Sequence, residues 1–361
     1  MWKIAAIPGD GIGVDVTREA LRVLRRAAAL GGASIEIDEW PHGAEHYLRT
    51  GMTITPAEVQ QLAEYDAIFL GALGDPRVPG NEHARDILLG LRFTLDLYIN
   101  LRPVRLWLAA HSPLRGVRPE DVDLVVFREN TEGVYVGMGG NFKAGTRDEV
   151  AVEEDVNTWK GVERIIRAAF EYAQGRRRRL VTLGDKANAM PHAGALWRRV
   201  FAEVGAGYPD VKRNAVYADA LALDLVLHPA RYDVIVAPNL FGDILSDLAA
   251  ALVGGLGLAP SASLHPGKAA LFEPVHGSAP DLAGTGRANP LAAILTAALV
   301  LEYLGAPASA RAVELAVRRT LERGATTPDL GGTLTCEQVG DAISAELAGC
   351  MQATGAAEPV E

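Results

Sequence analysis

The nine residues Asn239-Leu-Phe-Gly-Asp-Ile-Leu-Ser-Asp247 follow a short apolar run at 233–238 that is typical of a buried strand. Apolar residues then recur at helical spacing through Leu252, which predicts a helix. Asp243 and Asp247 are four residues apart, so their carboxylates share one face of that helix. Such a pair can bind a hard divalent cation such as Mg²⁺ or Mn²⁺. It can equally form a solvated helix face, and spacing alone favours that interpretation.

The length and composition predict a globular protein of two or three domains, or of two domains with shared elements. The chain has 361 residues, of which 49% are hydrophobic and 22% are charged, so it can bury a sizeable core. The formal net charge of −10 argues against nucleic acid or an anionic membrane as the main partner. We therefore expect a small-molecule ligand, with any anionic substrate held by a local group of basic residues.

Cysteine usage and the N-terminus predict a cytoplasmic protein. Cys336 and Cys350 are the two cysteines, too few and too close to the C-terminus for a disulfide framework, which indicates a reducing compartment. The first residues form a predicted strand and show no signal-peptide pattern. The most apolar stretch, 291–304, is too short to span a bilayer.

Predicted strands and helices alternate along the chain, so the expected fold class is α/β. A strand at 3–8 leads into Gly9-Asp-Gly-Ile-Gly13 and an amphipathic helix that ends at Gly31-Gly32. The dinucleotide fingerprint G-x-G-x-x-G fails here, because position 14 is Val14. We interpret the glycines as a tight turn that brings backbone close to a ligand.

Other local signals predict further elements. Thr55 and Thr335 each begin a capping box at a helix start. Residues 88–100 are expected to be helical and to lead to Arg102, and a strand at 123–127 precedes the polar segment 128–135.

Arg92, Arg102 and Arg128 are candidate ligands for a dicarboxylate substrate. Arginine offers fixed, bidentate donors that match carboxylate geometry. Any single one of them is more often part of a surface ion pair, and spacing alone does not predict that the three converge.

Tyr135 and Lys186 are candidate proton-transfer groups, because a phenol can donate a proton and a lysine of lowered pKa can accept one. Asp219 follows a predicted strand and could complete a three-carboxylate metal site. His276 lies in a Gly-Ser-Ala-Pro loop, where it could stack on a nucleotide base or be an ordinary loop histidine.

Five motifs follow one another along the chain. They are Pro8-Gly-Asp-Gly-Ile-Gly13, Asn100-Leu-Arg-Pro103, Arg128-Glu-Asn-Thr-Glu-Gly133, Asn239–Asp247, and His276-Gly-Ser-Ala-Pro-Asp281 with Asn289-Pro290. Each motif is weak alone, but the ordered set is specific. With these motifs the sequence resembles the β-decarboxylating dehydrogenase family, which includes isocitrate, homoisocitrate, tartrate/D-malate and 3-isopropylmalate dehydrogenases, and the resemblance runs from Ile4 to about Leu347.

The resemblance implies the two-domain α/β fold of isocitrate and isopropylmalate dehydrogenases rather than a conventional Rossmann fold. The cofactor-side domain would comprise 1–98 and 253–361, and the second domain, 99–252, would carry the metal site and the dimer interface. The family forms homodimers or larger assemblies with shared active sites. By analogy, Lys186 and Asp219 act in the site of the neighbouring subunit.

The resemblance also assigns roles to the candidate residues. Arg92, Arg102 and Arg128 would hold the substrate carboxylates. Mg²⁺ or Mn²⁺ would be held by Asp243, Asp247 and the neighbour's Asp219, which also borders the substrate.

In the implied reaction, an NAD-dependent oxidative decarboxylation, the metal polarises the hydroxyl group at C2 and later stabilises the enolate. Lys186 removes the hydroxyl proton while hydride passes to NAD. Loss of CO₂ follows, and Tyr135 protonates C3.

Asp281 implies NAD rather than NADP, since an acid at this position accepts hydrogen bonds from the ribose and repels a 2′-phosphate. The residues implied to line the adenosine site with it are His276, Gly277, Ser278, Ala279 and Asn289.

Leu88 and Leu89 are apolar where the family recognises the γ-group of its substrate, which favours 3-isopropylmalate and a role in leucine biosynthesis. The pair disfavours isocitrate more than it disfavours tartrate or D-malate. Arg85, one helical turn earlier, could bind an acidic γ-group, so homoisocitrate stays an alternative substrate. Ala189 is smaller than the Val or Ile usual in the family and leaves room in the pocket.

A catalytically silent regulatory subunit is a competing hypothesis from another class, although such subunits lose residues that this chain keeps. A metal-dependent phosphotransferase is disfavoured because the chain has no G-x-x-x-x-G-K-[ST] motif.

Overall fold

The computed structural model describes residues 1–355 and divides into two compact units. Unit 1 comprises Met1–Leu97, Leu106–Arg118 and Val253–Glu361, and unit 2 comprises Tyr98–Arg105 and Pro119–Leu252. Residues 106–118 thus group with unit 1, although we expected 99–252 as one continuous domain. Leu106 and Trp107 in this segment are buried, and His111 packs beside Gly254 of the same unit. The α/β fold class is confirmed.

The sheet of unit 1 has the strand order β2-β1-β3-β12-β11. β1 is parallel to β2 and β3, β12 is parallel to β3, and β11 is antiparallel to β12. The centre of β1 and all of β3 are buried, as expected for strands covered on both faces. The strands are β1 Trp2–Gly9, β2 Ile35–Glu39, β3 Ala67–Ala72, β11 Pro260–His265 and β12 Ala269–Pro274.

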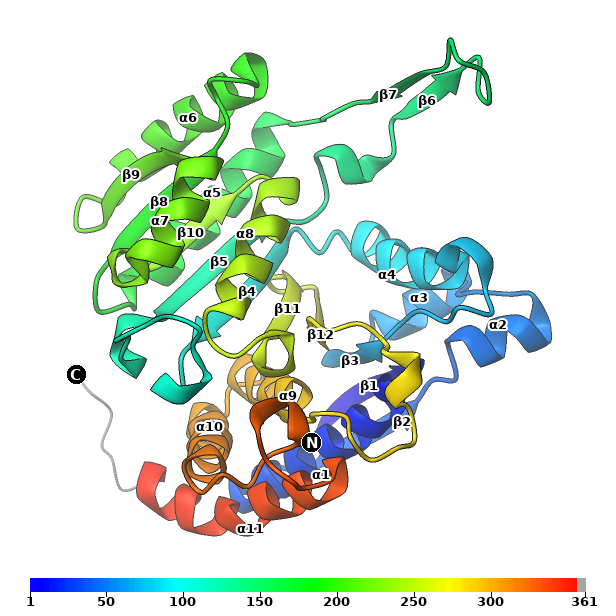
Figure 1. Ribbon diagram of the computed structural model, residues 1–361, viewed down its shortest axis with the longest axis vertical. Coiled ribbons are helices and arrows are strands. Elements are labelled where there is room, and N and C mark those ends of the chain that lie inside the picture. The colour runs from blue at the N-terminus through cyan, green and yellow to red at the C-terminus, as the bar shows by residue number, and fades with distance from the viewer. Residues whose placement is uncertain (356–361) are drawn as a thin grey trace. The chain divides into compact units, whose positions relative to one another are not determined.

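Helices cover both faces of this sheet (Figure 1). α3 and α4 pack on one face through a shared apolar core, and α1 and α9 pack on the other. Nearly every residue of α9 is buried, because α1, α10, β11 and β12 surround it. The helices are α1 Ile12–Leu30, α2 Ala44–Thr50, α3 Pro56–Leu62, α4 Glu82–Thr94, α9 Leu291–Tyr303, α10 Pro307–Glu322 and α11 Cys336–Gly355.

The main sheet of unit 2 has the order β4-β5-β10-β8-β9. β4 and β5 are antiparallel, whereas β10 is parallel to β5 and β8, and β8 is parallel to β9. β10 is fully buried, as its apolar sequence predicted. The strands are β4 Ile99–Arg105, β5 Asp123–Glu129, β8 Leu180–Asp185, β9 Lys212–Tyr217 and β10 Val234–Ala237.

Four helices flank this sheet, with α5 packed on α6 and α7 packed on α8. Pro238 follows the last residue of β10 and occupies the N-cap position of α8, so the helix begins at Asn239 directly beyond a buried strand. The four helices are α5 Trp159–Gln174, α6 Pro191–Ala206, α7 Ala218–Leu227 and α8 Asn239–Ala251.

A two-stranded antiparallel arm, β6 Gly139–Phe142 and β7 Val150–Glu153, extends from unit 2 (Figure 1). Every residue of both strands is exposed, including Phe142 and Val152. The sequence pattern of 139–153 predicts neither of these strands.

Both predicted capping boxes are present. The Thr55 hydroxyl accepts from the Glu58 backbone while Glu58 accepts from the Thr55 N–H, and Thr335 and Gln338 pair in the same way. The predicted helix at 88–100 is wrong at its end, because α4 stops at Thr94 and β4 begins at Ile99. Asp96 has φ 50, a left-handed conformation that a helix cannot continue through. Among residues 1–355, no helix has the length and apolar character needed to cross a membrane.

Candidate active site

Asp243 of α8 lies at the centre of a cluster of charged and polar side chains in unit 2. Arg128, at the end of β5, donates from Nη1 to its Oδ1, and Arg102 Nη2 from β4 lies 3.3 Å from the same oxygen. The Tyr135 hydroxyl donates to Oδ2 at 2.7 Å. Three side chains, from β4, from the end of β5 and from the segment that follows β5, therefore meet at one carboxylate of α8.

Asp247 lies one helical turn further along α8 and shares Arg102 with Asp243. Arg102 Nη1 donates to Asp247 Oδ1 at 2.9 Å and to the hydroxyl of Ser246 at 2.8 Å. The expectation that the two aspartates lie on one face is thus met by the geometry of α8. In this structure the two arginines contact carboxylates of the protein itself.

Two buried asparagines hold the arginines in place. Asn100 accepts from Arg102 Nε at 2.7 Å, and Asn239 accepts from Arg128 Nε at 2.9 Å. Asn239 also donates to the backbone carbonyl of Glu132 at 2.8 Å. Both asparagines stand in the sequence motifs, but the motifs do not predict this role, because the contact of an amide with an arginine depends on how the strands and α8 are placed together.

Gly242 permits the close approach of α8 to β5. A Cβ at this position would lie 3.0 Å from the backbone Cα of Arg128 and 2.7 Å from its Cβ. A larger residue would push α8 outward and separate Asp243 from Arg128. The glycine in the motif is therefore explained by packing.

The cluster combines buried cations with partly open carboxylates. The Arg128 side chain is 3% exposed, whereas those of Asp243 and Asp247 are 30% and 52% exposed. A buried guanidinium needs a paired anion, since an unpaired buried charge is costly. The two carboxylates also offer the oxygen ligands that Mg²⁺ prefers, with room for further ligands.

Asp243 and Asp247 are the two carboxylates that the described part of the chain brings together in this cluster. Within residues 1–355 no three His, Cys, Asp or Glu side chains are grouped so that they could hold a metal ion. Asp243 and Asp247 fit a divalent cation by their chemistry, because Mg²⁺ can be held by one or two carboxylates together with waters or substrate oxygens. Asp219, the third predicted ligand, is placed with Lys186 instead.

Lys186 and Asp219 form an ion pair with 2.6 Å between Nζ and Oδ2. The hydrogen bond from Lys186 is the largest cause that holds the pKa of Asp219 below its usual value. Asp219 lies in the first turn of α7, and its side chain is 68% exposed. The pair therefore presents an ammonium and a carboxylate at the surface of unit 2.

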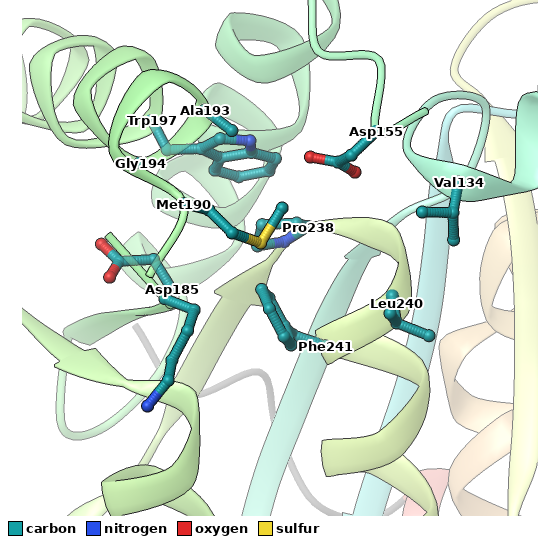
Figure 2. Close-up of a pocket in the computed structure, with 11 residues that line it drawn as sticks. Val134, Asp155, Asp185, Met190, Ala193, Gly194, Trp197, Pro238, Leu240 and Phe241 are labelled. Carbon is teal, nitrogen blue, oxygen red and sulfur yellow. The ribbon is translucent and has the colours of Figure 1, made fainter. Parts of the chain in front are cut away.

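A pocket of about 400 Å³, open solvent included, lies beside Lys186 (Figure 2). The indole N–H of Trp197 donates to Asn157 at 2.7 Å, and Asn157 donates in turn to Asp155 at 2.6 Å. Figure 2 shows the Asp155 carboxylate on the same side of the pocket as the Trp197 ring. The lining residues are Val134, Asp155, Asp185, Lys186, Met190, Ala193, Gly194, Trp197, Pro238, Leu240 and Phe241.

The remaining predicted substrate residues lie on α4 of unit 1. Leu88 packs against the apolar core between α3, α4 and the sheet. Leu89 is half-buried, and Arg92 is 5% exposed. Arg85, the candidate to bind the acidic γ-group of homoisocitrate, is exposed, and its Nε lies 3.7 Å from Asp86 Oδ1.

The predicted cofactor residues lie on the loop between β12 and α9. The Ile12 N–H donates to the carbonyl of Ser278 at 2.7 Å, and the Gly284 N–H donates to Asp15 at 2.9 Å. These bonds attach the loop to the start of α1. Asp281 is exposed, and space is open around Gly277.

His276 and Ala279 show local features that fit a ligand loop. His276 Nε2 is buried and has no hydrogen-bond partner, and burial is the main cause that lowers the pKa of this imidazole. Ala279 has φ 36, an unusual conformation for a residue with a side chain. A neutral ring with a free nitrogen is suited to stack on, or bond to, an adenine.

Asn289 is committed to the protein itself. Its Nδ2 donates to Asp329 at 2.9 Å, and its Oδ1 accepts from the Leu291 N–H at 3.0 Å at the start of α9. Any contact that it makes with a cofactor uses its second amide hydrogen or the second lone pair of Oδ1.

Comparison with known proteins places this geometry in a family. The model of the isocitrate/isopropylmalate dehydrogenase family matches residues 3–343. A 3-isopropylmalate dehydrogenase of Thermobifida fusca (strain YX) is 46% identical over 348 residues, which cover 96% of this chain and 98% of that protein. A protein of the same name from Clavibacter sepedonicus is 49% identical over 347 residues, covering 94% of this chain and 96% of that protein.

Solved structures agree with this placement. The crystal structure of isocitrate dehydrogenase from Methylococcus capsulatus matches with a TM-score of 0.87 and 39% sequence identity. The match covers 96% of this chain and 100% of that chain. A beta-decarboxylating dehydrogenase from Thermococcus kodakarensis is 35% identical with a TM-score of 0.82, covering 100% of both chains. The chain therefore belongs to the isocitrate/isopropylmalate dehydrogenase family, a family of enzymes, and is an oxidoreductase.

Proposed function

We propose that this protein is an NAD-dependent 3-isopropylmalate dehydrogenase that forms 4-methyl-2-oxopentanoate in leucine biosynthesis. The observation that carries the proposal is the full-length similarity to proteins of that name, at 46–49% identity. The apolar Leu88 and Leu89 on α4 support an alkyl γ-substituent, since a third carboxylate would be desolvated there without a partner.

The chain's own residues supply binding and proton transfer. Arg102, Arg128 and Arg92 hold the substrate carboxylates through charge-assisted hydrogen bonds. Lys186 of a neighbouring subunit takes the proton of the C2 hydroxyl, and Tyr135 returns a proton to C3. When bound, Mg²⁺ or Mn²⁺ supplies Lewis-acid polarisation, and NAD supplies the hydride acceptor.

Asp243 and Asp247 hold the cation together with the Asp219 of a second copy. The open faces of both carboxylates support this assignment, and so does the placement of Asp219 on a surface helix. The cofactor site comprises His276, Gly277, Ser278, Ala279, Asp281 and Asn289, and the negative charge of Asp281 favours NAD over NADP.

We further propose a homodimer with shared active sites, located in the cytoplasm. Large apolar side chains on α7 and α8 are exposed, with Leu223 at 63%, Leu227 at 60% and Ile244 at 56%. Exposed apolar patches of this kind mark association surfaces. The pocket beside Lys186 and the exposed arm add further apolar surface in the same unit.

Product analysis tests the proposal. Incubation with 3-isopropylmalate, NAD and Mg²⁺ should form NADH, CO₂ and 4-methyl-2-oxopentanoate in equal amounts, measured by absorbance and mass spectrometry. No NADH from this acid, or from isocitrate, homoisocitrate, D-malate and tartrate, would instead indicate a catalytically silent subunit.

For the metal, Asp243→Asn should remove most activity and weaken Mg²⁺ binding by at least about tenfold, because one charged ligand is lost. Mg²⁺ binding is measured by titration calorimetry. Asp210→Asn, in an exposed loop of the same unit, is the control. Unaltered Mg²⁺ affinity in Asp243→Asn would refute the assignment.

A further inference from the structure

The Asp10 carboxylate, in the glycine turn after β1, joins three other segments of unit 1. It is 5% exposed and accepts from the Ala44 N–H at 2.6 Å and the Gly74 N–H at 2.8 Å. Its Oδ2 also lies 2.8 Å from His83 Nε2. A carboxylate only accepts, so Nε2 carries the hydrogen. One side chain thus connects the turn, the start of α2, the loop after β3 and the start of α4.

His83 occupies a core position of α4. It is fully buried, and it lies four and eight residues before the buried Ile87 and Leu91, so the three share one face of the helix. The Tyr47 ring stacks on it, with centroids 6.0 Å apart and planes at 26°. An imidazole therefore ends an otherwise apolar stripe, and Asp10 satisfies its Nε2, whereas its Nδ1 is buried without a hydrogen-bond partner.

The first turn of α4 has no side-chain cap of its own. Its N-cap residue, Asn81, is left-handed with φ 50 and makes no capping bond, and its Oδ1 accepts from the Asp75 N–H at 3.2 Å instead. Tyr47 reaches Glu82 with a long, exposed hydrogen bond of 3.3 Å. The buried bond from His83 to Asp10 is the shortest of these attachments.

The same helix carries Leu88, Leu89 and Arg92, five to nine residues beyond His83. At 1.5 Å per residue, this is about 8–14 Å along one rigid element. A shift at the start of α4 is therefore transmitted to all three side chains. Displacements of about 1 Å in a substrate-binding group can cost about a hundredfold in rate.

We propose that Asp10 and His83 are positioning residues that set the place of α4 and thereby the selection of the substrate's γ-substituent. This inference rests on the proposed function, because it takes Leu88 and Leu89 as the contacts of that substituent. His83 acts through the helix and contacts no substrate.

The test compares kcat/KM for 3-isopropylmalate with kcat/KM for D-malate, which lacks the alkyl group. In His83→Phe, which keeps a ring but loses the hydrogen bond, this ratio should fall at least about tenfold. His83→Gln, which can place a donor near Asp10, should recover the ratio to within about threefold of the natural protein.

Val59→Ala is the matched control. Val59 is 3% exposed in α3, in the apolar core that α4 also shares, so its truncation lowers stability without touching the Asp10 bond. Its substrate ratio should stay within about twofold of the natural value. If His83 contributed to stability alone, the substrate ratio would change to the same extent in His83→Phe and in Val59→Ala.

The outcomes separate the two proposals. If the natural protein does not oxidise 3-isopropylmalate, the proposed function fails before any variant is measured. If it does, and folded His83→Phe keeps the natural ratio, the positioning role is overturned. Should His83→Phe not fold, Asp10→Asn is measured, because its amide group no longer accepts from all three donors. An unaltered ratio there also overturns the inference.

Discussion

At Asp243 a single carboxylate receives two guanidinium groups and a phenol. The sequence predicted the residue types, because carboxylates, arginines and a tyrosine suit a dicarboxylate and a cation. It could not predict that Arg128 is buried beside Asn239, since that contact depends on how closely α8 approaches β5 at Gly242.

Tyr135→Phe tests proton transfer at this carboxylate. Removal of the hydroxyl should lower kcat by about a hundredfold or more while KM changes little, because general-acid catalysis contributes about 10²–10⁴ in rate. Steady-state kinetics measure both values. Tyr208→Phe, which loses a 3.4 Å hydrogen bond to Glu171 away from the cluster, is the control. A kcat within twofold of the natural value would exclude Tyr135 as the acid.

Asp281→Lys tests cofactor choice. An ammonium at this exposed position should attract a 2′-phosphate, so the ratio of kcat/KM for NAD to that for NADP should fall at least about tenfold. Asp281→Asn, which removes charge without reversing it, should give a smaller change in the same direction. Unchanged selectivity in the lysine variant would show that Asp281 does not contact the ribose.

Elements with strong local signals matched their predictions. α8 begins where Pro238 ends a buried strand, and the capping boxes at Thr55 and Thr335 are formed. The end of α4 was missed, because the apolar periodicity of 88–100 continues past the left-handed Asp96. The β6–β7 arm was missed because its strands bury no face and so leave no alternating pattern.

The segment from β2 to α3 carries a buried histidine that should make stability depend on pH. His42 is 3% exposed, its Nε2 lies 3.4 Å from Glu58, and the His46 ring is 5.2 Å from its own. Burial is the main cause that lowers its pKa. In the unfolded chain the imidazole titrates near its ordinary value of about 6.5.

This difference in pKa between the folded and the unfolded chain sets the direction in which stability changes with pH. As pH falls below about 6.5, the unfolded chain gains a proton that folded His42 resists, so the free energy of unfolding decreases. His42→Gln should make this loss of unfolding free energy between about pH 7.5 and about pH 5 smaller, measured by urea unfolding at both pH values. Burial also lowers the pKa of His111 and of His276, so the variant still loses some unfolding free energy as the pH falls. His192→Gln, at an exposed histidine, is the control. If the free energy of unfolding of His42→Gln depends on pH as strongly as that of the control, the account is contradicted.

At the scale of the whole molecule, the predicted metal ligands lie in two separate groups, Asp243 and Asp247 with Arg102 and Asp219 with Lys186. The sequence predicted Asp219 as a third metal ligand, yet the described residues contain no group of three such ligands, and Asp219 pairs with Lys186. Under the proposed function, a second copy of the chain supplies Asp219 and Lys186 to the site that Asp243 and Asp247 begin. Neither composition nor motif spacing can predict such an arrangement, because it depends on surfaces that meet only on association.

Leu227→Glu tests the assembly. A charge on this exposed face of α7 should convert dimers to monomers in analytical ultracentrifugation, because burying an unpaired carboxylate is costly. Activity should fall by at least about a hundredfold as the shared sites separate. Leu30→Glu, at a 42% exposed leucine that ends α1 in unit 1, should leave both properties unchanged. A fully active monomer would contradict shared active sites.

The most direct test of the central claim is the set of kcat/KM values for 3-isopropylmalate, isocitrate, homoisocitrate, D-malate and tartrate with NAD and Mg²⁺. The apolar Leu88 and Leu89 predict that 3-isopropylmalate is preferred over each of the others by at least about tenfold. A higher kcat/KM for any of the other four acids would contradict the proposed substrate.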